Sequence, residues 1–415
     1  MDPTPPAMNP SPHPRRILLA TWGSTGDIAP YTGIATALRS AGHHLTVLTS
    51  SRYAPLFRAH HLDVHALPLD DHEDAIGRSP SRRARIGNAQ DMAVIAAQGM
   101  LAEAEKPLDL VLAHPLLHPQ AAVLARGLRV PCVGLYTVTH AMMLPRLLGP
   151  ASACRYTLAD VAARLALSPL YQPAVALLHR ELGLATRLTT RLAAFHGTEP
   201  IRYGINPGLT PLPALRHPRH RAVGHWRPAT EPGWTPDPLL EDFLAAGPPP
   251  VYFGFGSMSD FDADRLLLAI TRTVRRLRIR AVVQSGWAQL NSRQEDLITV
   301  GACPHTWLFP RMRAAVHHAG PGTLHACLEA GTPAVPVPVT YDQPFWATRL
   351  KTLGLTPTAL PVRQLDEHRL TTALEELLAN PRYRQRTQHW ARKLQAHDGT
   401  IALLDDIARL SRAHP

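Results

Sequence analysis

Short apolar runs alternate with helical stretches along the first half of the chain. The run Ile17 to Ala20 leads into a glycine-containing loop, and apolar residues then recur at helical spacing until Gly42. Further apolar runs, at 45–49, 110–113 and 131–135, are predicted as strands. Uninterrupted apolar strands that alternate with helices are typical of a parallel sheet covered on both faces. The first half is therefore predicted to be a doubly wound α/β domain.

A proline-rich stretch, 206–250, interrupts this pattern, and the alternation of strands and helices restarts after it. Strands are predicted at 251–255, 281–284, 298–300, 315–317 and 334–337, and helices at 262–278, 324–330, 343–353, 366–378, 381–396 and 400–411. The sequence thus predicts two doubly wound α/β domains that face each other, with ligands beyond the carboxyl ends of their strands.

The predicted division of the chain follows from these patterns. It has a disordered Pro-rich tail over 1–14, an N-terminal domain over 15–215, a connection over 216–249, a C-terminal domain over 250–385 and terminal helices over 386–415. With 415 residues, 45% of them hydrophobic, the chain is long enough to bury a core in each of two domains.

The charge of the chain is dispersed. A formal net charge of +11 first suggests a nucleic-acid-binding protein. Two short arginine-rich runs, at 82–85 and 272–280, are not interleaved with aromatic residues, and the other arginines stand singly. We therefore expect a solvated basic surface and no nucleic-acid partner, with a weak attraction to anionic membranes left as an open alternative.

Several classes of protein are excluded by simple features. The four cysteines are scattered without a CxxC pair, so neither a disulfide framework nor a zinc site is expected. No apolar run reaches the roughly 18 residues of a membrane helix. The Pro-rich N-terminus lacks the apolar segment of a signal peptide. A cytoplasmic protein is the resulting expectation.

The first candidate for chemistry is the Gly-Ser-Thr-Gly loop at 23–26, between the first strand and helix. Its glycines permit a sharp turn, and its free N–H groups can face an anion. The loop is not GxGxxG and no acidic residue ends the second strand, which argues against a dinucleotide dehydrogenase. Asp27 follows, either as the N-cap of a helix over 28–40 or as a general base at a cleft.

A second loop of small residues, His-His-Ala-Gly-Pro-Gly-Thr at 317–323, ends a strand and opens a helix. Its N–H groups and the helix dipole favour a diphosphate, and a histidine can donate to a phosphate oxygen. The alternative is a capped turn over packed histidines. One βα unit later, Asp342 and Gln343 either cap a helix or bind sugar hydroxyls at the same sheet edge.

Both loops belong to a series of short motifs that runs from about Arg16 to Leu403. The motifs are Gly23–Pro30, Gly42-His43, Gly224–Trp226, Phe255–Met258, Pro304–Arg311, His317–Thr323, Ala330–Pro333 and Asp342–Trp346. In this order and spacing they resemble the family 1 glycosyltransferases, in particular the bacterial natural-product branch that is also similar to sterol glucosyltransferases.

The resemblance implies a GT-B fold, with two facing Rossmann-like domains and a cleft between them. The C-terminal domain would bind a nucleotide sugar, the N-terminal domain the acceptor, and the final helices would return to the first domain. The implied reaction is inverting transfer of a hexose or deoxyhexose from a dTDP- or UDP-sugar to a hydroxyl of an apolar small molecule, as in antibiotic biosynthesis. No cofactor and no metal would be required besides the donor co-substrate.

The resemblance also implies roles for single residues. Asp27 would be the catalytic base. The diphosphate would be bound by Ser24, Ser257, His318, Gly320, Gly322 and Thr323, the nucleobase by Trp287, Cys303 and His305, and the sugar by Asp342 and Gln343. Tyr136, Met142 and Met143 are candidates for contact with an apolar acceptor, with plain core packing as an equal alternative.

The chain departs from the family pattern at three positions. Ala319 and Pro321 replace Gly and Ala in the phosphate motif, and Pro321 removes one N–H donor. Ala326 stands where plant relatives carry a glutamate that binds the ribose hydroxyls, which favours a dTDP-sugar without excluding a UDP-sugar.

Three other functions remain as alternatives. A glycosyltransferase could act on a lipid or sterol at a membrane surface, with the basic surface docked to it. A non-catalytic, glycosyltransferase-like accessory subunit would not need Asp27 or His318, although both are present. An epimerase of nucleotide sugars shares the fold but needs no acceptor base.

Overall fold

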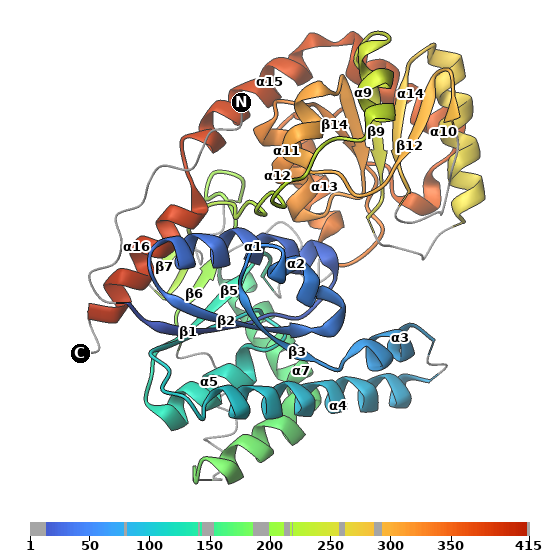
Figure 1. Cartoon of the computed structure of the whole chain (residues 1–415). Coiled ribbons are helices and arrows are strands. Elements are labelled where there is room, and N and C mark those ends of the chain that lie inside the picture. Colours follow the sequence, from blue (N-terminus) through green and yellow to red (C-terminus); the bar gives the residue numbers. More distant parts are fainter. Residues whose placement is uncertain are drawn as a thin grey trace.

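The computed structural model describes residues 14–78, 81–139, 142, 153–185, 199–210, 216–217, 219–256, 262–285 and 293–412. These residues form two lobes, each built on its own largely parallel sheet with helices packed on it (Figure 1). The predicted α/β architecture is therefore confirmed.

The first lobe contains a sheet of eight strands in the order β3-β2-β1-β4-β5-β6-β8-β7. The strands are β1 (Arg16–Ala20), β2 (His44–Ser50), β3 (Asp63–Leu67), β4 (Leu110–Ala113), β5 (Cys132–Tyr136), β6 (Ile201–Tyr203), β7 (Arg216–His217) and β8 (His220–Ala222). The helices are α1 (Thr25–Ser40), α2 (Ala54–Arg58), α3 (Asp70–Arg78), α4 (Arg82–Glu103), α5 (His118–Leu128) and α7 (Ala153–Glu181). All pairs are parallel except β7 with β8.

Strand β1 shows why this sheet is covered on both faces. Ile17 and Leu19 pack into the core that includes α1, whereas Leu18 and Ala20 pack into the core that includes α4 and α5. Successive side chains of a strand point to opposite faces, so an apolar run can fill two cores at once. Figure 1 shows the two layers, with α1 and α2 above the sheet and α4, α5 and α7 below it.

The second lobe has six strands in the order β11-β12-β10-β9-β13-β14. They are β9 (Val251–Gly254), β10 (Ala281–Gln284), β11 (Arg293–Gln294), β12 (Leu297–Val300), β13 (Ala314–His317) and β14 (Ala334–Pro336). The helices are α9 (Pro238–Ala245), α10 (Ala263–Leu277), α11 (His305–Leu308), α12 (Pro321–Glu329), α13 (Gln343–Thr352), α14 (Glu367–Ala379), α15 (Pro381–Gln395) and α16 (Gly399–Arg412).

The two lobes meet in a shared apolar cluster. Tyr136 and Met142 of the first lobe pack in the same buried cluster as Leu324 and Trp346 of the second. The Arg349 guanidinium, on α13, donates to the backbone carbonyl of Leu209 at 2.6 Å. These contacts fix the carboxyl ends of the two sheets relative to each other.

The predicted segment boundaries differ from the structure in two places. Strands β7 and β8 complete the first sheet although both lie within the stretch predicted as a connection, and α9 forms inside the same stretch. Helix α15 packs on α12 of the second lobe, so of the terminal helices it is α16 that packs on α1 of the first (Figure 1). There the Arg202 guanidinium and the Asp406 carboxylate form a buried ion pair at 2.7 Å.

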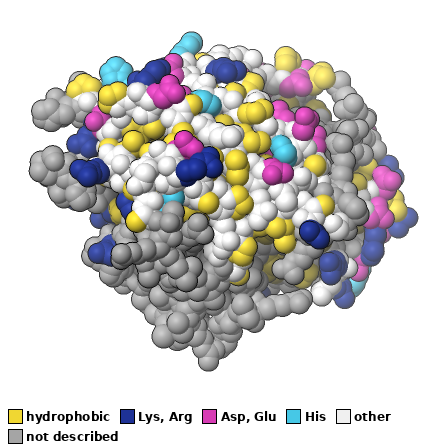
Figure 2. All heavy atoms as spheres, turned by 90° about the horizontal axis from the view of Figure 1, so that it is seen from below, with side chains coloured by type: hydrophobic (Ala, Val, Ile, Leu, Met, Phe, Trp, Pro, Cys, Tyr) yellow, Lys and Arg dark blue, Asp and Glu magenta, His cyan; other side chains and the backbone are white. Residues whose placement is uncertain are grey.

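The distribution of charged side chains on the surface agrees with the dispersed charge that the sequence predicts. Figure 2 shows basic and acidic side chains interspersed with apolar ones on the face that it displays. Across the described part of the chain, no helix combines the length and the apolar character that crossing a membrane demands.

Candidate active site

The predicted site residues lie at strand ends where the two lobes meet. Ser24 and Asp27 follow β1, His318 and Gly320 follow β13, and Asp342 lies after β14. Burial, with a smaller contribution from the negative charge of Asp27 on the other lobe, raises the pKa of Asp342 to about 6. The fold therefore brings the predicted base and the predicted sugar-binding carboxylate within electrostatic range of each other.

Asp27 is not the N-cap of its helix, so that alternative is wrong. Helix α1 begins at Thr25 with Ser24 as the N-cap residue. The Oδ2 atom of Asp27 accepts hydrogen bonds from the Ser24 backbone N–H at 2.9 Å and from the Ser24 hydroxyl at 2.7 Å. In a capping box, the acidic residue at the third helical position accepts a hydrogen bond from the N-cap residue in this way. It orients the Asp27 carboxylate, which stays partly exposed.

Gly23 makes this arrangement possible. Its φ is +145°, and a Cβ atom there would lie 2.8 Å from the Cβ atom of Asp27 and 2.9 Å from its Oδ2. A side chain at position 23 would therefore displace the carboxylate. The Ser24 hydroxyl is engaged with Asp27, so its predicted contact with a diphosphate would compete with this hydrogen bond.

The loop after β13 is organised by His317. Its Nδ1 atom accepts the backbone N–H of Ala319 at 3.0 Å, which stabilises the left-handed Ala319 at φ +66°. Helix α12 then begins at Pro321, earlier than the predicted start, with Gly320 as the N-cap residue. Proline suits the first helical position because the backbone N–H that it lacks would have no partner within the helix there. The unbonded N–H groups of this first turn are suited to an anion.

His318 lies between two glycine loops. A Cβ atom at Gly320 would approach the His318 Nε2 atom to 2.4 Å, and one at Gly256 would approach its Cε1 atom to 3.1 Å. Burial lowers the pKa of His318 to about 4, partly offset by a hydrogen bond with the backbone of Gly254. The imidazole is therefore neutral near pH 7 and has a single N–H, so donating it to a phosphate oxygen would replace the hydrogen bond with the Gly254 backbone.

Gly320→Ala is expected to weaken binding of a nucleoside diphosphate about tenfold, because the new methyl group would displace His318 and remove one hydrogen bond to a charged group. Isothermal titration calorimetry with dTDP and UDP measures the effect. Gly87→Ala, on α4 and away from the predicted site, is the control, because a Cβ atom at Gly87 meets nothing within 4 Å. Unchanged nucleotide affinity in Gly320→Ala would show that the position of His318 is not needed.

The predicted base-binding residues adjoin this loop. His305 stacks on Phe309, with ring centroids 4.5 Å apart. Burial first, and the charge of His318 second, lower the pKa of His305 to about 4, so the two histidines are neighbours. Cys303 is partly buried, and burial raises the pKa of its thiol to about 11. Ser257 and Trp287 lie outside the described residues.

The predicted sugar-binding side chains are fixed by neighbouring groups. The Oδ2 atom of Asp342 accepts from the Trp346 indole at 2.8 Å. The Oε1 atom of Gln343 accepts the backbone N–H groups of Val339 at 2.8 Å and of Thr340 at 3.1 Å. Asp342 is the N-cap residue of α13, but its side chain makes no capping hydrogen bond. Its carboxylate is thus available for a role other than capping.

Two of the predicted acceptor residues are buried. Tyr136 is 2% exposed and Met142 0% exposed, both in the apolar cluster between the lobes. The Tyr136 hydroxyl and the Nδ1 atom of His118 share a hydrogen bond at 3.0 Å. This packing favours the core alternative for both residues. Met143 lies outside the described residues.

Sequence reasoning missed residues that support the site. His317 positions the loop after β13, and Trp346 orients Asp342. The signal for Trp346 was its place four residues after Asp342, which puts both on one helix face. The hydrogen bond from the Ala319 backbone N–H to the His317 ring could not be predicted from residue spacing.

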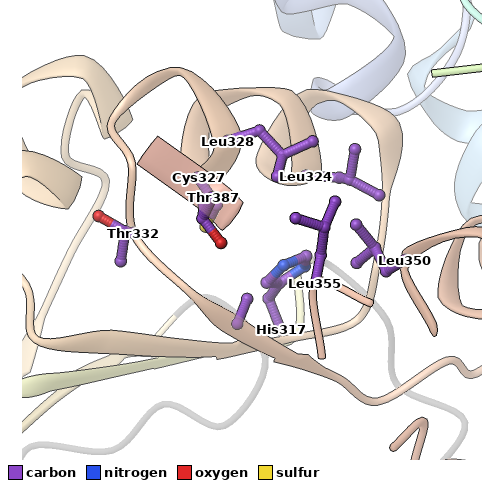
Figure 3. Close-up of a pocket in the computed structure, with 9 residues that line it drawn as sticks. His317, Leu324, Cys327, Leu328, Thr332, Leu350, Leu355 and Thr387 are labelled. Atoms are coloured by element: carbon purple, nitrogen blue, oxygen red, sulfur yellow. The ribbon is translucent and has the colours of Figure 1, made fainter. Parts of the chain in front are cut away.

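A small cavity lies beneath the phosphate loop, inside the second lobe. It has a volume of about 10 Å³, room for about one water molecule. Its lining residues are His317, Leu324, Cys327, Leu328, Thr332, Ala334, Leu350, Leu355 and Thr387 (Figure 3). The Nε2 atom of His317 is buried without a hydrogen-bond partner among the described residues. The cavity is too small for a substrate.

A cluster of charged groups joins helix α12 to the segment between the lobes. Glu329, at the end of α12, accepts from the Arg227 guanidinium at 2.8 Å and pairs with the His225 ring at 3.2 Å. Although burial opposes it, these two partners hold the pKa of Glu329 at about 2. His225 also stacks on His325, with ring centroids 4.4 Å apart. Helix α12 is thus tied to the segment between the lobes.

Comparison with known proteins is consistent with this geometry. Residues 279–400 match the family model of the erythromycin biosynthesis protein CIII-like C-terminal domain. The chain is 27% identical to sterol 3-beta-glucosyltransferase UGT80B1 of Arabidopsis thaliana, over 95% of this chain and 68% of that protein. It is 26% identical to O-mycaminosyltylonolide 6-deoxyallosyltransferase of Streptomyces fradiae, over 92% and 94% of the two chains.

The sterol relatives extend beyond the matched region. The chain spans 64% of a second Arabidopsis sterol 3-beta-glucosyltransferase, UGT80A2, and 30% of the sterol 3-beta-glucosyltransferase of Penicillium rubens. The bacterial relative is matched over nearly its whole length.

Solved structures show the same fold. The calicheamicin glycosyltransferase CalG4 superposes with a TM-score of 0.73 at 19% identity, over 97% of this chain and all of that one. The glycosyltransferase VinC, solved in complex with dTDP, superposes with a TM-score of 0.68 at 18% identity, over 96% of this chain and 100% of that one. The chain is thus a homologue of sterol and macrolide glycosyltransferases and has the two-domain GT-B fold that its motifs predict.

Proposed function

We propose that the protein is an inverting glycosyltransferase that moves a hexose or deoxyhexose from a dTDP- or UDP-sugar to a hydroxyl of an apolar small molecule. The observation that carries the proposal is that Asp27 follows β1 of the first lobe, while the His318 loop and Asp342 follow the paired strands β13 and β14 of the second lobe, where the two lobes meet. A base, a sugar-binding carboxylate and an anion-binding loop then lie at the ends of three strands, β1, β14 and β13.

The proposed reaction proceeds in one displacement. Asp27 accepts the proton of the acceptor hydroxyl while that oxygen bonds to the anomeric carbon from the face opposite the leaving group. The bond from the anomeric carbon to the diphosphate oxygen breaks, and the nucleoside diphosphate leaves with the electron pair. The His318 imidazole and the N–H groups at the start of α12 stabilise its charge. We propose that no metal is required, so turnover should survive EDTA.

A dTDP-sugar is our preferred donor. Ala326 offers no carboxylate to a ribose 2′-hydroxyl, and VinC, a structural neighbour, was solved with dTDP. A thermal-shift panel of dTDP, UDP, GDP and ADP tests the choice, because a bound ligand stabilises the folded state. We expect dTDP, and to a lesser extent UDP, to raise Tm by several degrees. Stabilisation by GDP or ADP alone would contradict the proposed donor class.

A sterol or other lipid, taken up at a membrane surface, is the second candidate acceptor. The similarity to sterol 3-beta-glucosyltransferases favours it. Cholesterol and O-mycaminosyltylonolide therefore serve as the two acceptor probes. Co-sedimentation with anionic vesicles tests the membrane surface: salt-sensitive binding supports docking, and no binding at low salt excludes it.

A further inference from the structure

Tyr341 has an unusual backbone conformation at the edge of the proposed site. Its φ is +56°, a region that tyrosine enters rarely because its side chain clashes with the backbone there. Backbone strain of this kind persists where the surrounding structure imposes it, and it gathers at functional sites. The residue lies in the loop between β14 and α13, directly before Asp342.

The surrounding hydrogen bonds hold Tyr341 in this conformation. The Gln343 backbone N–H donates to the Thr340 carbonyl at 3.2 Å and closes a turn around Tyr341 and Asp342. The Gln343 side chain accepts from two backbone N–H groups on the other side of Tyr341, those of Val339 and Thr340. The loop is thus fixed from both ends, and the Tyr341 ring is attached to a rigid support.

The ring itself is uncovered. Tyr341 is 60% exposed, more than the other large hydrophobic side chains that the structure describes as exposed, Leu239, Leu268 and Ile401. Those three belong to helices α9, α10 and α16, whereas Tyr341 lies at the strand ends where the lobes meet. A rigid, exposed tyrosine is an efficient binding surface because little conformational entropy is lost when its ring is covered.

We propose that Tyr341 is an acceptor-specificity residue, whose ring lies against an apolar, ring-containing acceptor bound beside Asp27. The inference rests on the proposed function. The predicted sugar ligands, Asp342 and Gln343, are 8% and 6% exposed, so the sugar would bind at buried groups. Tyr341 is 60% exposed instead, so its ring is open to contact with the second substrate.

Three variants test the proposal. Tyr341→Gly removes the ring and relieves the strain, so its Tm should not fall, whereas Kd and KM for the acceptor should rise about fivefold. Nucleotide affinity should be unaffected. Tyr341→Phe keeps the ring and should recover most of the acceptor affinity. Arg278→Gly is the matched backbone control, because Arg278 is exposed, has φ +50° and ends α10.

The measurements separate this inference from the proposed function. Acceptor Kd is measured by calorimetry with cholesterol in cyclodextrin and with O-mycaminosyltylonolide, in the presence of dTDP and without turnover. Weakened acceptor binding by Tyr341→Gly supports the inference even if the wild-type protein transfers no sugar. A lack of sugar transfer would refute only the proposed reaction. The inference is overturned if Tyr341→Gly leaves the acceptor affinity unchanged or alters the donor affinity instead. It is also overturned if the wild-type protein binds neither acceptor probe.

Discussion

Asp27→Asn is expected to lower kcat about 10³-fold and to leave the Kd for dTDP or UDP within about twofold of the wild-type value. Positioned general bases contribute about 10²- to 10⁴-fold, and an amide cannot accept the proton of the acceptor hydroxyl. The asparagine oxygen can still accept the two hydrogen bonds from Ser24, so the start of α1 should be preserved. Steady-state kinetics and calorimetry on the same preparation measure the two quantities.

Ser24→Ala is the matched control for this experiment. It removes the hydroxyl that donates to Asp27 at 2.7 Å but leaves the backbone N–H that donates at 2.9 Å. We expect a loss of roughly tenfold or less, in keeping with one hydrogen bond that orients the base. If Asp27→Asn keeps full turnover, Asp27 is not the base.

The two buried histidines His317 and His325 are together expected to lower the free energy of unfolding by about 4 kcal/mol between pH 7 and pH 5. His317 and His325 are both 0% exposed. Burial is the main cause that lowers the pKa of each to about 3. In the unfolded chain a histidine has a pKa near 6.5, so below that pH the unfolded state binds protons that the folded state does not. Each histidine removes up to about 1.4 kcal/mol per pH unit once the pH is well below 6.5, which amounts to about 2 kcal/mol between pH 7 and pH 5.

Other groups change this slope in known directions. His305 and His318, with pKa values lowered to about 4, add to the loss. Asp342, with a pKa raised to about 6, opposes the loss of stability, because the folded state binds a proton there near pH 6 and no longer buries a charged carboxylate. Glu329, with a pKa near 2, adds a loss only below about pH 4.5.

Urea denaturation from pH 8 to pH 5 measures the pH dependence. His325→Phe keeps the aromatic contacts with His225 and Trp346 but cannot be protonated, so its slope should be smaller by one proton. A wild-type free energy of unfolding that stays constant between pH 7 and pH 5 would contradict the neutral, buried state of these histidines.

The apolar pattern was sufficient to predict most of the central strands. The observed bounds of β1, β2, β4, β5, β9, β10, β12, β13 and β14 lie within one residue of those predicted. Such strands are buried on both faces and carry an unbroken apolar signal. Strands β3, β6, β7, β8 and β11 were missed because they are short or carry polar residues, which leaves little apolar signal. Three of them, β3, β7 and β11, are edge strands, where polar residues are tolerated.

The site was predicted less completely than the fold. Motif order located the loops of Asp27, His318 and Asp342, which the structure places at the strand ends between the lobes. The pattern could not show that Ser24 caps α1, nor that Tyr136 is buried between lobes, because both depend on contacts made only in three dimensions. The left-handed conformation of Tyr341 likewise has no signal in its residue type.

The most direct test of the account is a transfer assay analysed by mass spectrometry and NMR. The wild-type protein is incubated with an α-linked dTDP- or UDP-hexose and each of the two acceptor probes. We predict an acceptor whose mass has increased by one hexose residue, with a β-configured anomeric carbon, and formation of this product about 10³-fold more slowly by Asp27→Asn. An α-configured product, or donor turnover without any acceptor, would contradict inverting transfer with Asp27 as the base.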